Sequence, residues 1–254
     1  MVATTTRDRP TLSGRRRLIR RLARLLTIAI VSPAIFVGWR WASGNLGEVE
    51  HNRVFRSAQL GPKAIERLVR AHGIKTVINL RGRNPEARWY RLEREATLKA
   101  GATHVDFSMA SDMWLSRNQA HALMNVLKDC EYPIAIHCEW GAERTGLVSA
   151  FVSLSRPGNT IDEARGQFSP YYLFLPNAHG KTMRSHVDAY QAWLAVKHMI
   201  HSAESFRLWI AEEYRPLGPS REDWPFNPYP LVEIEKPGAP KRVVLLDSHR
   251  SNSR

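Results

Sequence analysis

The sequence predicts an α/β domain built on a largely parallel sheet, and two observations lead to that class. Short apolar runs typical of strands alternate with longer helical segments along residues 54–154. One of these runs, 134–136, leads through a tight turn into a continuous helix-compatible stretch, 147–154. Strands that alternate with helices pair in parallel, so we expect a central, largely parallel sheet flanked by helices, with an N-terminal membrane anchor before it.

The first part of this domain contains two predicted strand and helix pairs. They occupy residues 54–55 (strand), 62–71 (helix), 74–80 (strand) and 85–100 (helix). Pro62 suits a first helical turn, and Gly73 suits the end of a helix. The helix over 85–100 is heavily charged, and its spacing predicts Trp89, Leu92 and Ala96 as the buried stripe.

The next predicted strand, 103–109, alternates apolar and polar residues. This pattern predicts one buried face, formed by Val105, Phe107 and Met109, and one polar face, formed by His104, Asp106 and Ser108. A helix follows, with Ser116 as its N-cap and Gln119 at capping-box distance. We expect Ala120, Leu123 and Leu127 to face inward from it.

The rest of the chain predicts three further helices and an extended segment. The helices cover residues 159–164, 181–200 and 206–214, and the second one presents Val187, Tyr190 and Leu194 on one side. His198, His201 and Glu204 would fall on successive turns if that helix continued, but we do not expect a metal site there. Between residues 216 and 240, seven prolines alternate with Trp224, Phe226 and Tyr229, which indicates an extended segment that lies on the domain or binds a partner.

The stretch from Ile134 to Gly146 carries the chemistry. It places Cys138 and Arg144 six positions apart where a strand turns into a helix. Backbone N–H groups at a helix N-terminus bind anions, and Gly141 would let the loop turn closely around a phosphate. The guanidinium of Arg144 suits two phosphate oxygens. The partial positive charge at the helix N-terminus also favours a thiolate, so we expect a lowered pKa for Cys138 and a nucleophilic role.

Other residues of this loop have predicted supporting parts. His137 would orient the loop by hydrogen bonding, and the hydroxyl of Thr145 would donate to the sulfur. The predicted phosphate-binding residues are Glu139, Trp140, Gly141, Ala142, Glu143 and Arg144.

Residues His137 through Gly146 match every fixed position of the pattern H-C-x-x-G-x-x-R-[ST]-G. In this the chain resembles the cysteine-dependent protein tyrosine phosphatases, in particular the compact dual-specificity-like bacterial branch. The resemblance extends over about residues 54–194, through the stretches 54–59 and 73–81. It implies the fold of that family and hydrolysis through a phosphocysteine intermediate, with no metal or other cofactor.

A general acid must protonate the leaving oxygen. In a parallel sheet, ligands bind beyond the carboxyl ends of the strands, where 81–83, 110–112 and 137–138 would meet. Asp112 lies past a strand end and before a helix, which is where the resembled phosphatases carry their acid. Asp106 is the alternative, although the alternation places it within the strand, and Asp112 could instead serve only to cap the helix at Ser116.

Glu139 and Glu143 place negative charge beside the predicted phosphate site, which disfavours polyanionic inositol phosphates and phosphoinositides. We therefore expect a phosphotyrosine protein phosphatase, with phosphoserine and phosphothreonine left open. The alternative is a catalytically weak, membrane-tethered module that binds phosphoproteins, although an intact Cys138 and a candidate acid argue against it. A sulfur-transfer enzyme is a further alternative, in which the Thr-Gly pair after Arg144 has no evident purpose.

The formal net charge of +13 is unevenly distributed. The first 24 residues hold eight arginines and one aspartate, a local charge of +7. The remainder is modestly basic, so no nucleic-acid partner is expected. Two cysteines, Cys130 and Cys138, are too few for a disulfide scaffold or a cysteine-rich metal site.

Residues 25–39 form an uncharged, mostly apolar run after the arginines, with Trp39 and Trp41 at its far edge. Its length is intermediate between a signal-peptide core and an anchor, and no clear cleavage site follows. We expect an uncleaved signal anchor within residues 1–44, a phosphatase domain at 45–214 and a proline-rich extension at 215–254. The arginines predict an exported catalytic domain. A cytosolic protein with a basic arm is the alternative.

Overall fold

The computed structural model describes residues 12–176, 178–220, 231–239 and 242–244, and the chain divides into two compact units, Met1–Ala42 and Ser43–Arg254. The first unit contains helix α1, Leu12–Ala42. Within it, Ile19–Ala42 has a mean hydropathy of 1.8 in its most apolar window, so this helix is long and apolar enough to cross a membrane. A signal sequence near an N-terminus shares these properties.

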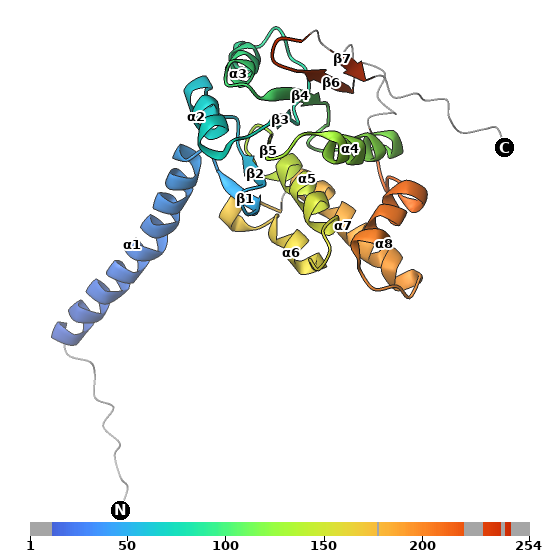
Figure 1. Ribbon diagram of the computed structural model, residues 1–254. Helices are drawn as coiled ribbons and strands as arrows, with labels where there is room; N and C mark the ends of the chain where they lie inside the picture. Colours follow the sequence, from blue (N-terminus) through green and yellow to red (C-terminus); the bar gives the residue numbers. More distant parts are fainter. Residues whose placement is uncertain (1–11, 177, 221–230, 240–241, 245–254) are drawn as a thin grey trace, which may run out of the picture. The chain divides into compact units, whose positions relative to one another are not determined.

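The second unit is organised around a sheet of seven described strands in the order β1-β2-β5-β3-β4-β6-β7 (Figure 1). The strands are β1 (Gly47–Glu50), β2 (Val54–Ser57), β3 (Thr76–Asn79), β4 (Thr103–Phe107), β5 (Ile134–His137), β6 (Val232–Glu235) and β7 (Arg242–Val244). The four central strands, β2, β5, β3 and β4, are mutually parallel, and β1, β6 and β7 are added antiparallel at the edges. The predicted α/β class with a largely parallel core is confirmed.

Strands β6 and β7 come from the segment that follows residue 214. Val232 pairs with Phe107 and Glu235 pairs with His104, so β6 covers the free edge of β4. The aromatic residues Trp224, Phe226 and Tyr229 and the polar C-terminal residues lie outside the described residues. The division of the chain at residues 44 and 214 stays a prediction.

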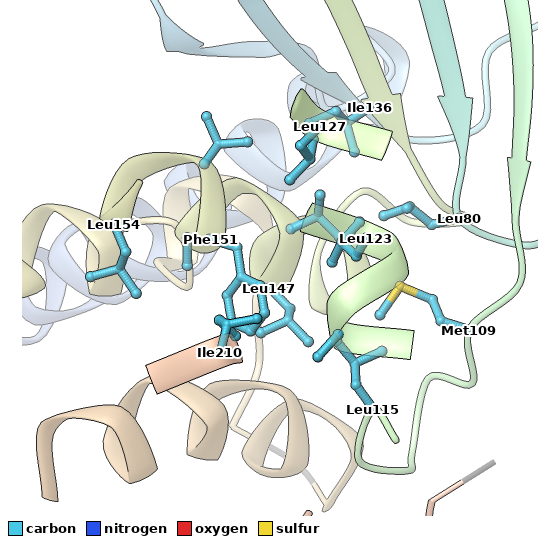
Figure 2. Close-up of a cluster of buried hydrophobic side chains, with 14 of the residues drawn as sticks. Leu80, Met109, Leu115, Leu123, Leu127, Ile136, Leu147, Phe151, Leu154 and Ile210 are labelled. Atoms are coloured by element: carbon cyan, nitrogen blue, oxygen red, sulfur yellow. The ribbon is translucent and has the colours of Figure 1, made fainter. Parts of the chain in front are cut away.

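Helices cover both faces of the sheet. On one face, α2 (Pro62–His72) and α3 (Arg88–Lys99) contribute to an apolar cluster formed by Phe55, Ile65, Leu68, Val69, Ile74, Val77, Ala96, Ala102 and Ala135. On the other face, α4 (Arg117–Asp129), α5 (Glu143–Leu154) and α7 (Ala178–Val196) share the larger core. Figure 2 shows part of that core, which includes Leu123 and Leu127 of α4 and Leu147 and Phe151 of α5.

Several helix boundaries follow directly from the sequence. Ser116 accepts a hydrogen bond from the Gln119 backbone, and the Gln119 side chain accepts one in return, so the predicted capping box is confirmed. Thr160 caps α6 (Ile161–Gly166) in the same way. Gly73 adopts a φ of 61° after α2, a conformation that glycine takes without steric cost.

Two predictions about burial were wrong. His104 and Asp106 are buried, so both faces of β4 are covered, not one. The buried side of α3 is formed by Tyr90, Glu93, Ala96 and Thr97, whereas Trp89 and Leu92 are half-buried. Both errors have one cause: the carboxyl half of this sheet face is polar, and α3 covers it with polar side chains of its own.

The last predicted helices end earlier than expected. Helix α7 stops at Val196, and α8 spans Ala203–Leu208 before a π-helical turn at Trp209–Glu213. The ladder of His198, His201 and Glu204 therefore does not form, and His201 instead lies 2.8 Å from the Tyr190 hydroxyl. Among the described residues, no group of three or more His, Cys, Asp or Glu side chains could hold a metal ion.

Candidate active site

The candidate site lies at the carboxyl end of the parallel strands. We call residues 138–142, which join β5 to α5, the phosphate loop. Because β5 lies between β2 and β3, the connections that follow these strands reach the same edge of the sheet. Within the described part of the chain, no side chain caps the N-terminus of α5, so its first N–H groups are available to an anion.

Cys138 begins the phosphate loop and is 1% exposed. Burial alone would raise its pKa, but the charge of Arg144, the hydroxyl and N–H of Thr145 and the N–H of Gly141 lower it, and the net pKa lies below the ordinary thiol value. The Gly141 N–H donates to the sulfur over 3.3 Å. These surroundings favour a thiolate, the nucleophilic form of cysteine.

Gly141 makes the tight turn of the phosphate loop with a φ of 69°. A Cβ at this position would lie 2.6 Å from the Ala58 nitrogen and 2.7 Å from the Ser57 carbonyl oxygen. Both are backbone atoms at the end of β2, so neither can move aside alone. The loop therefore requires glycine for its conformation and for its close approach to the neighbouring strand.

Three residues that precede or follow the first strands, or lie in them, donate hydrogen bonds to backbone carbonyl groups of the phosphate loop. Arg56 is fully buried and donates to the Gly141 carbonyl over 2.8 Å. Asn45 donates to the Trp140 carbonyl over 2.9 Å, and the Gln59 N–H donates to the Glu139 carbonyl over 3.1 Å. Consecutive loop carbonyls are thus occupied, which leaves the loop N–H groups to face the sulfur side.

Arg56 is itself fixed by a second set of contacts. Its Nη1 atom donates to both the carbonyl and the side-chain oxygen of Gln167 over 2.8 Å. Its guanidinium lies 3.7 Å from the centroid of the Tyr172 ring. Arg56 therefore links the phosphate loop to the segment after α6, and its burial is offset by hydrogen bonds and a cation–π contact.

Arg144 lies in the first turn of α5, next to the phosphate loop. Its Nη1 donates to the Met109 carbonyl over 3.5 Å, which connects it to the segment between β4 and α4. In the described part of the chain, no carboxylate lies within 4.0 Å of this guanidinium. Its remaining donors are therefore available to a phosphate group.

The two glutamates of the loop region differ in their surroundings. Glu139 lies 3.6 Å from Arg81, whose guanidinium also stacks 3.8 Å from the Trp89 ring centroid. Arg81 thus offsets part of the negative charge at Glu139. Glu143 occupies the first turn of α5, where the helix dipole favours an acidic side chain. Trp140 between them is 58% exposed and forms an aromatic surface at the loop.

His137 precedes the nucleophile and is buried. Its Nδ1 lies 3.2 Å from the Cys138 carbonyl oxygen and its Nε2 lies 2.8 Å from Glu93 Oε1. Burial opposes protonation, but the charge and hydrogen bond of Glu93 raise the pKa of His137 above its ordinary value. The predicted orienting position of His137 therefore has a specific partner on α3.

The two candidate acids lie in different environments. Asp106 is buried on β4, and its carboxylate accepts hydrogen bonds from Asn79 and from the Tyr90 hydroxyl. Asp112 is exposed in the segment between β4 and α4, which is fixed before it at Met109 and after it at Trp114. Of these two carboxylates, that of Asp112 is exposed, whereas that of Asp106 is buried in the sheet, and the role of Asp112 as the acid stays a prediction.

Sequence reasoning missed Glu93, Asn45 and the structural part of Arg56. A charged residue inside the apolar strand run 54–57 was a usable signal for Arg56, because a buried arginine needs partners. Glu93 gave no such signal, since charged residues surround it on a helix that reads as solvent-exposed.

Comparison with known proteins agrees with this geometry. Residues 38–155 match the sequence model of the tyrosine phosphatase family, a range that includes the phosphate loop, Arg144 and Asp112. The resemblance to the cysteine-based phosphatases is thereby confirmed. Among curated proteins, none matches the chain.

The chain is also similar to several solved structures. TpbA of P. aeruginosa is 17% identical, with 67% of this chain and 93% of that chain covered, at a TM-score of 0.47. The core catalytic domain of the PP-IP phosphatase SIW14 of S. cerevisiae, solved with citrate, is 20% identical over 61% of this chain and 92% of that chain, at a TM-score of 0.43. At these TM-scores neither structure indicates what this chain acts on.

Proposed function

We propose that this chain is a cysteine-based hydrolase of phosphoric monoesters that dephosphorylates phosphotyrosine in proteins, and the match of residues 38–155 to the tyrosine phosphatase family supports this. The observation that carries the proposal is the buried Cys138 sulfur at the base of the phosphate loop, with a lowered pKa and with the Gly141 N–H 3.3 Å away. A thiolate beneath a ring of N–H groups and an arginine suits attack on phosphorus.

In the first proposed step, the Cys138 thiolate attacks phosphorus, the S–P bond forms and the P–O bond to the leaving group breaks. Asp112, protonated at this stage, gives its proton to the leaving oxygen. Arg144 and the N–H groups of the phosphate loop stabilise the negative charge on the three equatorial oxygens. The products are phosphocysteine, the alcohol or phenol, and the Asp112 carboxylate.

In the second proposed step, the Asp112 carboxylate takes a proton from a water molecule whose oxygen attacks phosphorus. The S–P bond breaks, inorganic phosphate leaves and the Cys138 thiolate is restored. The Thr145 hydroxyl, buried beside the sulfur, helps to lower the thiol pKa and so eases departure of the sulfur. Neither step requires a metal ion or another cofactor.

The preference for phosphotyrosine is supported by the surface around the phosphate loop. The exposed ring of Trp140 offers an apolar face to an aryl ester. Glu143 remains as negative charge near the loop, which disfavours substrates with several phosphates. Because Arg81 offsets Glu139, we expect a moderate preference for phosphotyrosine over phosphoinositides, and comparable peptides bearing phosphoserine to be slower.

The proposed acid is tested by an Asp112→Ala variant of the full-length chain, purified in detergent with a reductant and a chelator. We expect wild type to hydrolyse a small aryl phosphate under these conditions, and the variant to be slower by roughly 10²–10⁴-fold in kcat. A leaving group that departs without a proton should reduce the difference between the two proteins.

An Asp162→Ala variant provides the matched control, since Asp162 is exposed in the first turn of α6. Its rate should equal that of wild type. If chelator abolishes hydrolysis, or if Asp112→Ala retains the wild-type rate, the proposed mechanism is wrong. A phosphoinositide hydrolysed faster than a phosphotyrosine peptide would overturn the substrate assignment while leaving the mechanism intact.

We further propose that α1 anchors the chain in a membrane with the catalytic domain exported. The support is the 24-residue apolar helix Ile19–Ala42 with arginines at its N-terminal side. In a bacterial host, we expect the full-length chain to stay in the membrane pellet after alkaline carbonate extraction and to be degraded by protease added to spheroplasts. Recovery of a soluble chain shortened by its first residues would identify a cleaved signal sequence instead.

A further inference from the structure

Glu93 lies on α3 outside the phosphate loop, yet its carboxylate is a meeting point of several donors. Its side chain is fully buried. Oε1 lies 2.8 Å from His137 Nε2 and 3.4 Å from His104 Nε2, and Oε2 accepts a hydrogen bond from the Gln59 amide. Burial would raise the pKa of Glu93, but His137 and His104 lower it to about 2, so the carboxylate is stable as an anion.

The position of His137 between two acceptors fixes its protonation. The Cys138 carbonyl oxygen, 3.2 Å from Nδ1, can only accept a hydrogen bond, so Nδ1 must donate. Nε2 lies 2.8 Å from the Glu93 carboxylate, whose negative charge favours a proton on this nitrogen as well. The carbonyl at Nδ1 and the carboxylate beside Nε2 both favour the imidazolium form of His137, whose positive charge would lie one residue from the nucleophilic sulfur.

Other charged groups surround this pair on every neighbouring element. His104 on β4 lies 3.8 Å from Asp106, whose carboxylate is held by Asn79 and Tyr90. Arg94, on α3 itself, pairs with Glu235 of β6. Arg83 and Glu233 form a pair at 3.1 Å, also at β6. Asp106, Arg94, Arg83 and their partners are paired among themselves, whereas His104 shares the Glu93 carboxylate with His137 at the longer distance of 3.4 Å.

A second connection runs from Glu93 to the rim of the phosphate loop. The Gln59 side chain that donates to Glu93 also accepts from Arg81 over 3.2 Å. Arg81 in turn pairs with Glu139, and the Gln59 backbone donates to the Glu139 carbonyl. Glu93 is thus connected to the phosphate loop in two ways, through His137 and through Gln59 with Arg81.

We propose that Glu93 is a positioning residue that keeps His137 charged, and that this imidazolium both holds the Cys138 carbonyl and stabilises the Cys138 thiolate. The proposal deepens the proposed function, because it assigns a residue of α3 to the phosphate-ester chemistry of the loop. Glu93 touches neither the sulfur nor a substrate, and acts through His137.

The test measures the reactivity of Cys138 without any phosphate ester. Full-length protein carrying Cys130→Ser is alkylated with iodoacetamide over a range of pH, and modified Cys138 is quantified by mass spectrometry. Glu93→Gln keeps the side-chain shape and removes the charge, so a neutral His137 should result. We expect the alkylation rate at a fixed mildly acidic pH to fall by roughly three- to tenfold, with the profile displaced to higher pH.

Two further variants separate positioning from general stability. Glu95→Gln, at an exposed position of the same helix, should leave the profile unchanged. His137→Asn removes the imidazolium and keeps a donor near the Cys138 carbonyl, so it should slow alkylation by a similar factor. In the His137→Asn background, Glu93→Gln should then add almost nothing, because its effect passes through His137.

Imidazole nitrogen NMR gives an independent signature. The His137 signals are assigned as those that disappear in His137→Asn. At neutral pH they should show two protonated ring nitrogens in the parent protein and one in Glu93→Gln. Circular dichroism confirms that each variant is folded, and if Glu93→Gln does not fold, His137→Asn alone tests the role of the imidazolium.

The proposal is overturned if His137→Asn leaves the alkylation rate unchanged, or if Glu93→Gln slows it equally in both backgrounds. It is also overturned if His137 keeps both protons in Glu93→Gln. A reactive Cys138 in a protein that hydrolyses no phosphate ester would contradict the proposed function and leave this inference standing.

Discussion

Replacing Cys138 with serine should lower kcat for aryl phosphate hydrolysis by about 10⁴-fold or more. The hydroxyl of serine is not ionised near neutral pH, so the surroundings that lower the thiol pKa cannot produce an oxyanion nucleophile. The phosphate loop and Arg144 remain, and the variant should therefore still bind a phosphotyrosine peptide with an affinity similar to that of wild type. Initial-rate kinetics and binding calorimetry measure the two properties separately.

Cys130→Ser is the matched control for this change. Cys130 is half-buried at the end of α4, and burial raises its pKa to about 11, so it is a poor nucleophile. This variant should keep the wild-type rate. If wild type and Cys138→Ser were equally inert while both bound the phosphopeptide, the chain would be a phosphoprotein-binding module and not an enzyme.

Replacing Arg144 with lysine should lower kcat by about 10²–10³-fold. Lysine keeps the positive charge and the length, but it loses the planar pair of donors that suits two phosphate oxygens. Because the charge on these oxygens grows in the transition state, the loss should appear mainly in kcat and less in KM. The thiol pKa of Cys138 should change little, since a cation remains nearby.

Arg91→Lys tests whether arginine-to-lysine changes are harmful in general. Arg91 is exposed on α3 and donates to the Pro85 and Glu86 carbonyls, away from the phosphate loop. The Arg91→Lys variant should therefore have the activity of wild type. An Arg144→Lys enzyme with unchanged kcat and a raised KM would show that Arg144 contributes to substrate binding alone.

The local pattern of the sequence was enough to predict the strand-loop-helix unit around Cys138. The strand and helix of this unit are short and contiguous in sequence. Elsewhere in the domain, a capping box at Ser116 and a glycine at Gly73 mark helix boundaries. The phosphate loop is likewise a contiguous stretch, so its residues could be named before any tertiary contact was known. The α/β class followed from the alternation of these units.

The environment of the site could not be predicted in the same way. Glu93 and His137 are 44 positions apart, and only the packing of α3 on the sheet brings them within 2.8 Å. An apolar stripe did not identify the buried face of α3, because this face packs on a part of the sheet that carries the polar side chains of His104 and Asp106. Hydropathy assigns charged residues to solvent, and buried ionic networks are where this assumption fails.

The edge pairing of β6 with β4 affects the order in which the chain can fold. Val232 pairs with Phe107 across 125 positions of sequence, so the neighbour of β4 leaves the ribosome long after the strand it covers. Until then, the nascent sheet has an open edge beside Asp106 and His104. Translation of the phosphate loop therefore precedes closure of its own domain, and a chain truncated before residue 232 would carry the whole catalytic motif on an unfinished sheet.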